Sequence, residues 1–524
     1  MSCTLWRIYW KGMSTMKICL RLFAISFVAT LLSASGVAQT ASPVTQAGRA
    51  DYQLYGAPLK AAAPDPAIAA ALRQVSSARI EKIITTLVGF GTRSTLSSME
   101  TDLPAGQGAT AAADWIFAQF EQISKECGGC LEVRRDTFVQ PVSSRVARPT
   151  TITNVYAILR GKDAAQAARM YLVTGHYDSR DSDNSDDHGA APGANDDASG
   201  VAVSLECARV LSQASLKQHW PASLVFVAVA GEEQGLYGSS HLAKLARAEG
   251  WHLEGVLNND IVGGNTTPGD KLQLKDRIRV FSEGIPTTAT PDQVRRIRAL
   301  GLVEDAPSRQ LARAVALAGQ TYLSGLHGAP DFSAFLVARP DRYLRGGDHS
   351  SFNQQGFAAV RLTEWREDFN HQHQNVRIEN GIQFGDLLRF VDFRYVANVA
   401  KLNAATLGTL AASPGVPTGF KIHAEKLENG TTLSWDAPQP VPAAGFHYEL
   451  VWRRTDAADW QYGKAVAPPE DAGQAVTLTV PISKDNVIFG VRTVDAAGHT
   501  SLVTTVTVPQ PAVTAQRSAW EPAS

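Results

Sequence analysis

The sequence predicts an α/β domain built on a largely parallel sheet, followed by a smaller all-β domain. Between residues 151 and 260, apolar stretches with strand character alternate with segments whose apolar residues recur at helical spacing. This alternation is typical of a parallel sheet covered by helices. Residues 223–230 are almost continuously apolar and rich in valine, as expected for a strand buried on both faces. Beyond residue 417, short alternating strands separated by Gly, Pro, Asn and Asp indicate a β-sandwich of about 100 residues.

The helices and strands follow from apolar spacing and turn residues along the chain. The predicted helices cover residues 66–88, 109–124, 197–212, 239–249, 291–300, 308–317 and 384–405. The predicted strands of the α/β domain cover residues 151–159, 170–174, 223–230, 255–258, 278–281 and 360–362. Those of the sandwich cover residues 431–435, 448–452, 476–480, 487–494 and 502–506. We interpret the irregular residues 263–348 as an elaboration that returns to the sheet.

Length and charge limit the classes of function. The chain has 524 residues, too many for one ordinary domain, so two or three units are expected. Its formal net charge is -1, and it has no long basic or acidic block. There is therefore no electrostatic reason to expect nucleic acid or an anionic membrane surface as a partner.

Residues 1–38 are predicted to be a signal peptide. Two basic residues precede an apolar run over residues 22–32, and small residues ending at Ala38 follow, in the order of a secretory leader. A start at Met13 or Met16 would give a leader of more usual length. The alternative is an uncleaved anchor, although the apolar run is short for a membrane span. We expect a secreted or periplasmic protein with no stable membrane insertion after cleavage.

Changes in composition divide the rest of the chain into a lead-in, two domains and a tail. Residues 39–70 are rich in Ala, Pro and Gln and are predicted to be an extended lead-in. The α/β domain covers residues 71–410, and residues 413–417 resemble a linker. The sandwich covers residues 415–508, and residues 509–524 are predicted to be a flexible tail.

The five cysteines suggest one disulfide. Cys3 and Cys19 lie in the predicted leader, and Cys127 and Cys130 form a Cys-Gly-Gly-Cys motif. In an exported protein this motif predicts a disulfide across a tight turn. A metal or redox role is the alternative, but no second Cys or His pair lies nearby in the sequence. Cys207 lies in a predicted helix and is expected to be an inert core thiol.

Residue types that bind metals occur where predicted strands end. In chain order these are His176, Asp178, Asp196, Asp197, Glu232, Glu233, Asp260 and His349. Each one alone has an ordinary explanation, such as a helix cap or a solvated loop residue. Ligands in α/β sheets gather at the carboxyl ends of strands. Together, two imidazoles and several carboxylates there predict a two-metal site, which implies hydrolysis of a stable bond.

The residue types also suggest a division of roles. Asp196 has two carboxylate oxygens and can bridge two metals. Asp178 can accept a hydrogen bond from the ring nitrogen of His176 that does not bind the metal, and so fix the tautomer and orientation of the imidazole. Neighbouring side chains at a strand end diverge. One of Glu232 and Glu233 can therefore bind metal while the other acts as a general base.

Other candidates in the sequence are weaker. The acidic run over residues 178–187 lacks the glycine and the final glutamate of an EF-hand loop, so a solvated loop is expected rather than a calcium site. His188, His371 and His373 could line the site, but we interpret them as surface histidines. Ser350 lies outside any Gly-x-Ser-x-Gly motif, which argues against a serine hydrolase.

The order of these motifs resembles that of the secreted co-catalytic dizinc exopeptidases, the group of bacterial leucyl and Streptomyces-type aminopeptidases, with glutamate carboxypeptidase as a relative. The resemblance covers roughly residues 70–405 and implies a three-layer α/β/α fold with a mixed, largely parallel central sheet. It implies Glu232 as the general base and Asp178 as the partner of the first zinc-binding histidine. The ligand set that it implies for two Zn²⁺ is His176 and Asp260 for one ion, Glu233 and His349 for the other, and Asp196 as the bridge.

The resemblance carries two further expectations. The bridging aspartate of this family is often followed by a cis peptide, so the bond between Asp196 and Asp197 is expected to be cis. Relatives use a tyrosine to assist the oxyanion. Tyr322 and Tyr343 are both candidates for that role here.

The C-terminal unit resembles a fibronectin type III domain. Trp435 fits the core tryptophan of an early strand, and the segment that begins at Phe489 fits the late strand. The corner tyrosine usual two residues earlier is Val487 here. Such a module is more often a binding or spacer domain than a catalytic one, so binding of a surface or polymer is expected.

The resemblance implies an exported zinc-dependent exopeptidase that acts on peptide or protein substrates. An aminopeptidase that hydrolyses N-terminal residues through a zinc-bridging water is the leading interpretation. A carboxypeptidase or a glutaminyl cyclase-like activity on the same fold is the first alternative. A non-catalytic binding protein is the second.

Overall fold

The computed structural model describes residues 49–60, 62–213, 215–216, 219–325, 330–426, 428–442, 445–471 and 473–506. The predicted signal peptide and the predicted tail lie outside these residues, so both stay predictions. Within the described ranges, no helix combines the length and the apolar character that a membrane crossing needs.

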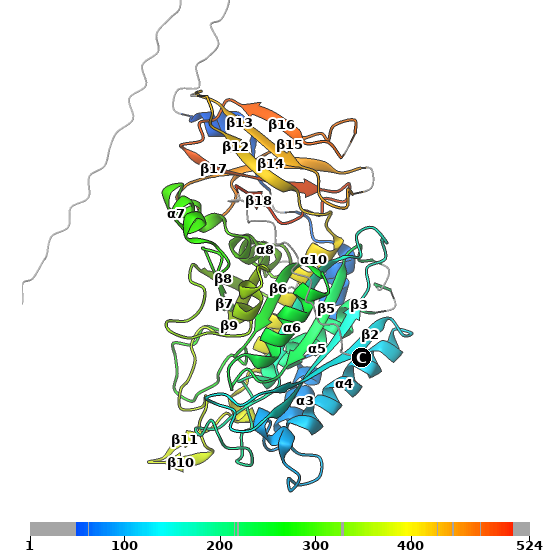
Figure 1. Ribbon diagram of the computed structural model, residues 1–524, viewed down its shortest axis with the longest axis vertical. Helices are drawn as coiled ribbons and strands as arrows, with labels where there is room; N and C mark the ends of the chain where they lie inside the picture. Colours follow the sequence, from blue (N-terminus) through cyan, green and yellow to red (C-terminus); the bar gives the residue numbers. More distant parts are fainter. Residues whose placement is uncertain are drawn as a thin grey trace, which may run out of the picture. The chain divides into compact units, whose positions relative to one another are not determined.

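An eight-stranded sheet forms the centre of the α/β domain (Figure 1). Its strands lie in the order β2-β3-β5-β4-β6-β9-β7-β8. Their bounds are β2 Leu131–Gln140, β3 Thr150–Leu159, β4 Arg169–His176, β5 Ser223–Val229, β6 His252–Asn259, β7 Arg277–Ser282, β8 Ser333–Val337 and β9 Ala359–Thr363. β4 runs parallel to β5 and β6, β6 to β9, and β7 to β8. The remaining neighbours pair antiparallel, so the sheet is mixed, as predicted.

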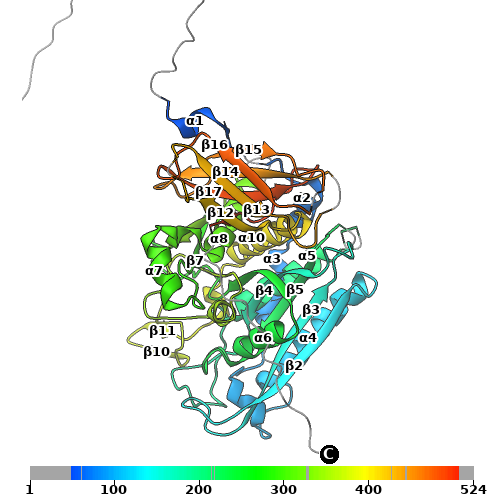
Figure 2. The same ribbon diagram turned by 45° about the horizontal axis from the view of Figure 1, so that its top comes forward.

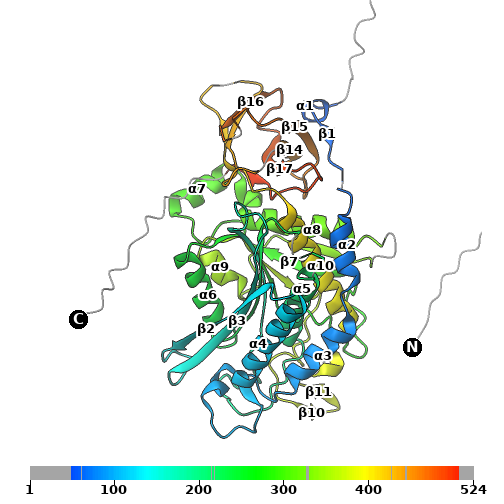
Figure 3. The same ribbon diagram turned by 90° about the vertical axis from the view of Figure 1, so that its right-hand side faces the viewer.

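Helices cover both faces of this sheet. Figure 3 shows α6 and α9 on one face and α3, α4, α5 and α10 on the other. The helices are α2 Pro66–Arg73, α3 Ser77–Val88, α4 Gly108–Glu126, α5 Ala198–Leu211, α6 Tyr237–Ala248, α7 Pro291–Ala299, α8 Pro307–Tyr322, α9 His349–Gln354 and α10 Phe393–Ala412. Along β5, Val225 and Val227 pack with α6, whereas Leu224 and Phe226 pack with α5 and α10. The valine-rich strand is therefore buried on both faces of a three-layer α/β/α fold.

The C-terminal part is a sandwich of two antiparallel sheets around its own core (Figure 2). One sheet has the order β12-β13-β16 and the other β1-β15-β14-β17-β18. The bounds are β1 Ala57–Pro58, β12 Thr418–His423, β13 Thr431–Asp436, β14 His447–Arg454, β15 Tyr462–Val466, β16 Val476–Val480, β17 Val487–Val494 and β18 Thr504–Thr505. Buried Trp435, Tyr448, Trp452 and Phe489 lie between the sheets.

The N-terminal lead-in differs from its prediction as an extended segment. Its described part forms the short helix α1, Asp51–Leu54, and the strand β1, which pairs antiparallel with the sandwich strand β15. Trp452 Nε1 donates a hydrogen bond to the carbonyl of Tyr52 over 2.8 Å. An edge strand such as β15 presents unpaired main-chain groups, and β1 satisfies part of that edge. The helix α2 also begins inside the predicted lead-in.

Buried polar contacts join the sandwich to the α/β domain. Arg453 of β14 forms an ion pair with Asp305, 3.2 Å apart, and only 1% and 2% of the two side chains is exposed. Arg313 of α8 donates to the carbonyl of Ala458 over 2.7 Å. Burial raises the pKa of Asp305 to about 6 although Arg453 opposes the rise. Desolvation therefore outweighs the attraction between the two charges.

Most predicted elements are present, with shifts at places where polar residues cap helices. The single helix predicted over residues 66–88 is two helices, because the Ser76 side chain accepts from the amide of Arg79 and starts α3. α10 begins after the capping residue Asp392 instead of near residue 384. Residues before it form the 3-10 turn Leu388–Phe390 and the hairpin of β10, Arg377–Glu379, and β11, Ile382–Phe384. The strand β2 was not predicted, because only one neighbour, β3, pairs with it and much of it is exposed.

The cysteine predictions are confirmed for the described residues. Cys127 and Cys130 form a disulfide at the C-terminal end of α4. Cys207 is a free, buried thiol in α5.

The ion pair between Arg453 and Asp305 makes a stability prediction. Arg453→Met leaves a buried carboxylate without its cation, so we expect a loss of about 3 kcal/mol of stability. The double variant Asp305→Leu/Arg453→Met removes both charges and should recover most of this loss. Scanning calorimetry measures the effect as a lower midpoint temperature in the single variant only. An unchanged midpoint in Arg453→Met would show that the pair does not join the two parts.

The same pair predicts a pH dependence of stability. The folded-state pKa of Asp305 is about 6, above the value of about 3.9 for an unfolded chain. A carboxyl group with a raised pKa binds its proton more tightly in the folded state, so stability falls as the pH rises through 6. Comparing wild type with Asp305→Asn between pH 5 and pH 8 isolates this contribution. A difference between the two midpoints that stays constant over this range would contradict it.

Candidate metal centre

The candidate site lies where three parallel strands end. His176 is the last residue of β4, Asp260 directly follows β6, and Glu232 and Glu233 follow β5 after a short turn. β4 lies between β5 and β6 and runs parallel to both. The carboxyl ends of the three strands therefore bring these side chains to one edge of the sheet, as the sequence predicts.

One group of possible ligands contains His176, Glu232 and Asp260, whose ligand atoms lie within 4.8 Å of one another. His176 Nε2 is 3.8 Å from Asp260 Oδ1. Its other nitrogen, Nδ1, donates to the main-chain carbonyl of Asp178 over 3.0 Å. This hydrogen bond orients the ring and directs Nε2 toward the carboxylates.

A second group contains Asp196, Glu233 and His373. His373 Nε2 lies 3.0 Å from Asp196 Oδ2 and 3.0 Å from Glu233 Oε2. The other oxygen of Asp196, Oδ1, lies 3.1 Å from His176 Nε2 in the first group. Asp196 therefore presents one oxygen to each group, which is the geometry of a bridging carboxylate.

The structure places His349 in neither group of possible ligands. This residue begins α9 and is fully buried, and its Nε2 donates to the carbonyl of Pro340 over 2.8 Å. The imidazole in the second group belongs to His373, which we interpreted from the sequence as a surface histidine. His373 lies in the loop after β9, a neighbour parallel to β6, so the strand-end rule could have found it.

The electrostatics of the two groups fit metal ions. His176 Nε2 and Glu233 Oε1 are buried and make no hydrogen bond. Burial raises the pKa of Glu232 well above its usual value, and the nearby Asp260 and Glu233 add to the rise while His176 opposes it. Two imidazoles and several carboxylates in a buried cluster form a nitrogen and oxygen donor set that suits zinc.

Hydrogen bonds hold the two glutamates in place. Asp178 Oδ1 accepts from the amide of Glu232 over 3.3 Å, and its Oδ2 accepts from the amide of Glu233 over 3.1 Å. The hydroxyl of Thr95 donates to the same Oδ2 over 3.0 Å. Asp178 thus positions the whole turn after β5 as well as the His176 imidazole, a role that the sequence did not reveal.

Two further residues, which sequence reasoning missed, orient the aspartates. Asp386 Oδ2 accepts from the amide of Asp196 over 2.7 Å. Arg361 Nη1 lies 2.6 Å from Asp260 Oδ2 and leaves Oδ1 facing His176. The peptide bond between Asp196 and Asp197 is cis, as expected. Nothing local in the sequence pairs Asp386 or Arg361 with residues more than 100 positions away.

A cavity of about 740 Å³ opens over the two groups. The lining residues include Asp196, Glu232, Glu233, Asp260, His373 and four arginines. Neither candidate oxyanion tyrosine lines it. Tyr322 accepts a hydrogen bond from the amide of Asp65, and Tyr343 is 77% exposed to solvent.

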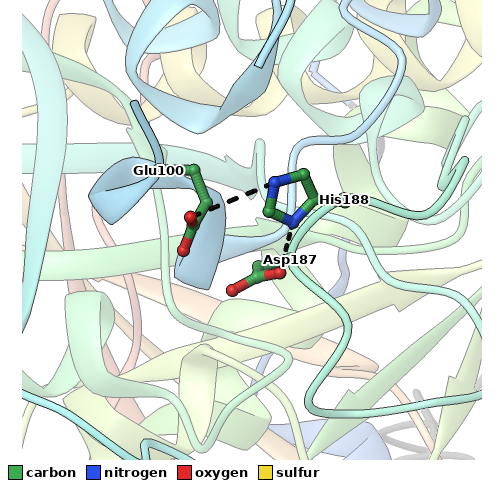
Figure 4. A group of neighbouring side chains, drawn as sticks. All are labelled: Glu100, Asp187 and His188. Carbon is green, nitrogen blue, oxygen red and sulfur yellow. Dashed lines mark hydrogen bonds and ion pairs between the residues drawn. The ribbon is translucent and has the colours of Figure 1, made fainter. Parts of the chain in front are cut away.

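A third acidic group lies at the surface. Glu100, Asp187 and His188 approach one another there (Figure 4). Arg148 forms ion pairs with both Glu100 and Asp187, and Asp187 also pairs with His188 over 2.6 Å. Glu100 and Asp187 therefore already have cationic partners, and their closeness needs no metal ion.

Comparison with known proteins identifies the family. The family model described as peptidase family M28 matches residues 154–289. A probable zinc metalloprotease of Leptosphaeria maculans is 42% identical over 433 residues, which cover 82% of this chain and 95% of the relative. The chain belongs to peptidase family M28. A second relative, a probable zinc metalloprotease of Pyricularia oryzae, is 43% identical over 454 residues, which cover 86% of each chain.

Solved structures similar to this M28 member share little sequence with it. The LapA aminopeptidase of Legionella pneumophila is 21% identical, with a TM-score of 0.44 over 66% of this chain and 75% of that one. The glutaminyl cyclase of Porphyromonas gingivalis is 17% identical, with a TM-score of 0.41 over 64% of this chain and 98% of that one.

The two histidines of this M28 chain make a paired prediction. We expect His373→Ala to lower the zinc content of the purified protein, because Asp196 and Glu233 lose the imidazole between them. His349→Ala is the matched control, since it removes a buried histidine that belongs to neither group, and it should keep its zinc. Elemental analysis after gel filtration measures both. Normal zinc in His373→Ala together with a loss in His349→Ala would restore the sequence-based ligand set.

Proposed function

We propose that this M28 member is a zinc-dependent exopeptidase with two zinc ions, and that it acts as an aminopeptidase on peptides or proteins. The observation that carries this proposal is the position of Asp196 between two ligand groups, with Glu232 beside them in an open cavity. The relatives called probable zinc metalloproteases support the choice of zinc and of a peptide bond as the target.

The proposed ligands divide between two ions. His176 and Asp260 would hold the first zinc, Glu233 and His373 would hold the second, and Asp196 would offer one carboxylate oxygen to each. Bound zinc would act as a Lewis acid toward the peptide carbonyl and would make a water molecule acidic enough to attack it near neutral pH.

Glu232 is the proposed general base and acid. Its amide is held by Asp178, so its carboxylate stays at the cavity wall, where it can reach an attacking water. It accepts the proton of that water as the carbon–oxygen bond forms. It then delivers the proton to the nitrogen of the departing amine as the peptide bond breaks.

We also propose a location for the protein and a role for the sandwich. The leader-like residues 1–38 support a secreted or periplasmic location. The three-strand sheet β12-β13-β16 against the sheet that contains β15, β14, β17 and β18 supports a fibronectin type III-like unit. We propose that this unit binds a surface or polymer.

Removal of the general base tests the mechanism. Glu232→Gln keeps the size of the side chain but cannot accept a proton, so we expect kcat to fall about a hundredfold to ten-thousandfold. The zinc content should stay unchanged, because five other residues hold the ions. Activity equal to wild type in Glu232→Gln, or full activity after a chelator has removed the metal, would refute the proposal.

The type of exopeptidase follows from blocking either end of the substrate. We expect peptides with a free amine to be cleaved and the same peptides with an acetylated amine to resist cleavage. Loss of cleavage only when the carboxyl end is amidated would indicate a carboxypeptidase. Release of ammonia from an N-terminal glutamine without peptide cleavage would indicate a glutaminyl cyclase. A protein without bound metal and without activity would be a binding protein.

A further inference from the structure

Four arginines line the cavity over the metal centre: Arg145, Arg180, Arg342 and Arg345. The lining carboxylates are Asp196, Glu232, Glu233 and Asp260. Under the proposed function, two divalent ions supply four positive charges, which balance these four carboxylates. The arginines therefore leave the cavity with excess positive charge when the site is loaded.

The partners of the outer arginines do not remove this excess. Glu367 forms ion pairs with three guanidinium groups, those of Arg279 at 3.2 Å, Arg342 at 2.9 Å and Arg345 at 2.6 Å. These arginines lower the pKa of Glu367, although its burial opposes the shift. Arg342 has a second carboxylate, Asp341, at 3.1 Å. Arg345 has to share the carboxylate of Glu367 with Arg279 and Arg342, and its side chain is 31% exposed. Part of its guanidinium can therefore bind a ligand.

Arg145 is the second available cation. It lies on the loop between β2 and β3, is exposed, and donates to the main-chain carbonyl of Glu233 over 3.1 Å. Among the described residues, no carboxylate forms an ion pair with it. Arg180 differs, because Glu233 Oε2 lies 3.0 Å from its Nε and it also contacts His373.

Both available arginines are tied to the metal centre itself. Arg145 is bound to the main chain of the ligand Glu233. Arg345 Nη1 donates to Gln372 Oε1 over 3.4 Å. The side-chain nitrogen of the same glutamine, Nε2, donates to Asp196 Oδ2 over 2.9 Å. Both arginines therefore line the same cavity as the two ligand groups, where a bound substrate would lie.

We propose that Arg145 and Arg345 bind a carboxylate of the substrate, so that the preferred substrates of this peptidase are peptides with an acidic group near the cleaved bond. This rests on the proposed function of the same site. The carboxylate is either an acidic side chain or the free α-carboxylate of a short peptide. Guanidinium groups bind carboxylates through charge-assisted hydrogen bonds. Two nitrogens of one guanidinium can bind the two oxygens of one carboxylate, which selects for the planar shape of that group.

The test measures binding without turnover. Zinc-loaded Glu232→Gln is titrated by calorimetry with three matched pairs of free-amine dipeptides. The pair Glu-Leu amide and Leu-Leu amide tests an acidic side chain at the first residue of the peptide. The pair Leu-Glu amide and Leu-Gln amide tests an acidic side chain at the second residue. The pair Leu-Leu and Leu-Leu amide tests the free α-carboxylate. In at least one pair we expect the carboxylate form to bind about tenfold tighter or more, as for a hydrogen bond between charged groups.

Arginine variants in the same background identify the cause. Arg145→Gln and Arg345→Gln should each reduce that affinity ratio severalfold, and high salt should reduce it further. Arg160→Gln is the control, since Arg160 is an exposed arginine paired with Glu132 outside the cavity. It should leave the ratio unchanged. Equal binding within all three pairs, or a ratio that survives in Arg145→Gln/Arg345→Gln, would overturn the proposal.

The outcome separates this inference from the proposed function. If the carboxylate preference holds in the binding assay but the wild-type protein cleaves none of the five peptides, then the peptidase proposal fails and the anion site stands. If the wild-type protein cleaves both members of every pair with equal kcat/KM and binding is also equal, then the peptidase proposal stands and the anion site fails.

Discussion

The burial of several carboxylates at one edge of the sheet is the constraint on which the rest of the structure depends. Asp178, Asp196, Glu233 and Asp260 are all at most 5% exposed. A buried carboxylate without compensation costs several kcal/mol. Some of the compensation is present in the chain, as in the contact of Arg361 with Asp260. Bound metal ions would supply the rest of the positive charge that offsets this cost, because the possible ligand atoms converge in two groups.

The layers of the fold make this concentration of charge tolerable. β4, β5 and β6 are anchored by apolar side chains on both faces, so their carboxyl ends are fixed in space. Asp178 and Asp386 then accept main-chain hydrogen bonds from the turns that carry the ligands. Each ligand is thus positioned by a rigid strand and by a polar partner behind it. Such support keeps a catalytic site in its reactive geometry.

The sequence could predict the parts of this arrangement that depend on local patterns. The apolar strands and the residues that follow them indicate His176, Asp196, Glu233 and Asp260, and the structure places these four in the two groups. The sequence favours His349 over His373, whereas the structure places His373 in the second group. Both residues follow glycine-rich or irregular loops, and only the folded chain shows which loop lies beside the strand ends. The pairing of β1 with β15 was also beyond reach, since it joins segments about 400 residues apart by main-chain hydrogen bonds.

The most direct test of the central claim is anomalous diffraction at the zinc absorption edge from crystals of the purified protein. We expect two peaks, one for a zinc ion held by His176 and Asp260 and one for a zinc ion held by Glu233 and His373, with Asp196 in contact with both. A structure without zinc at these residues, or with a zinc ion bound by His349, would contradict it.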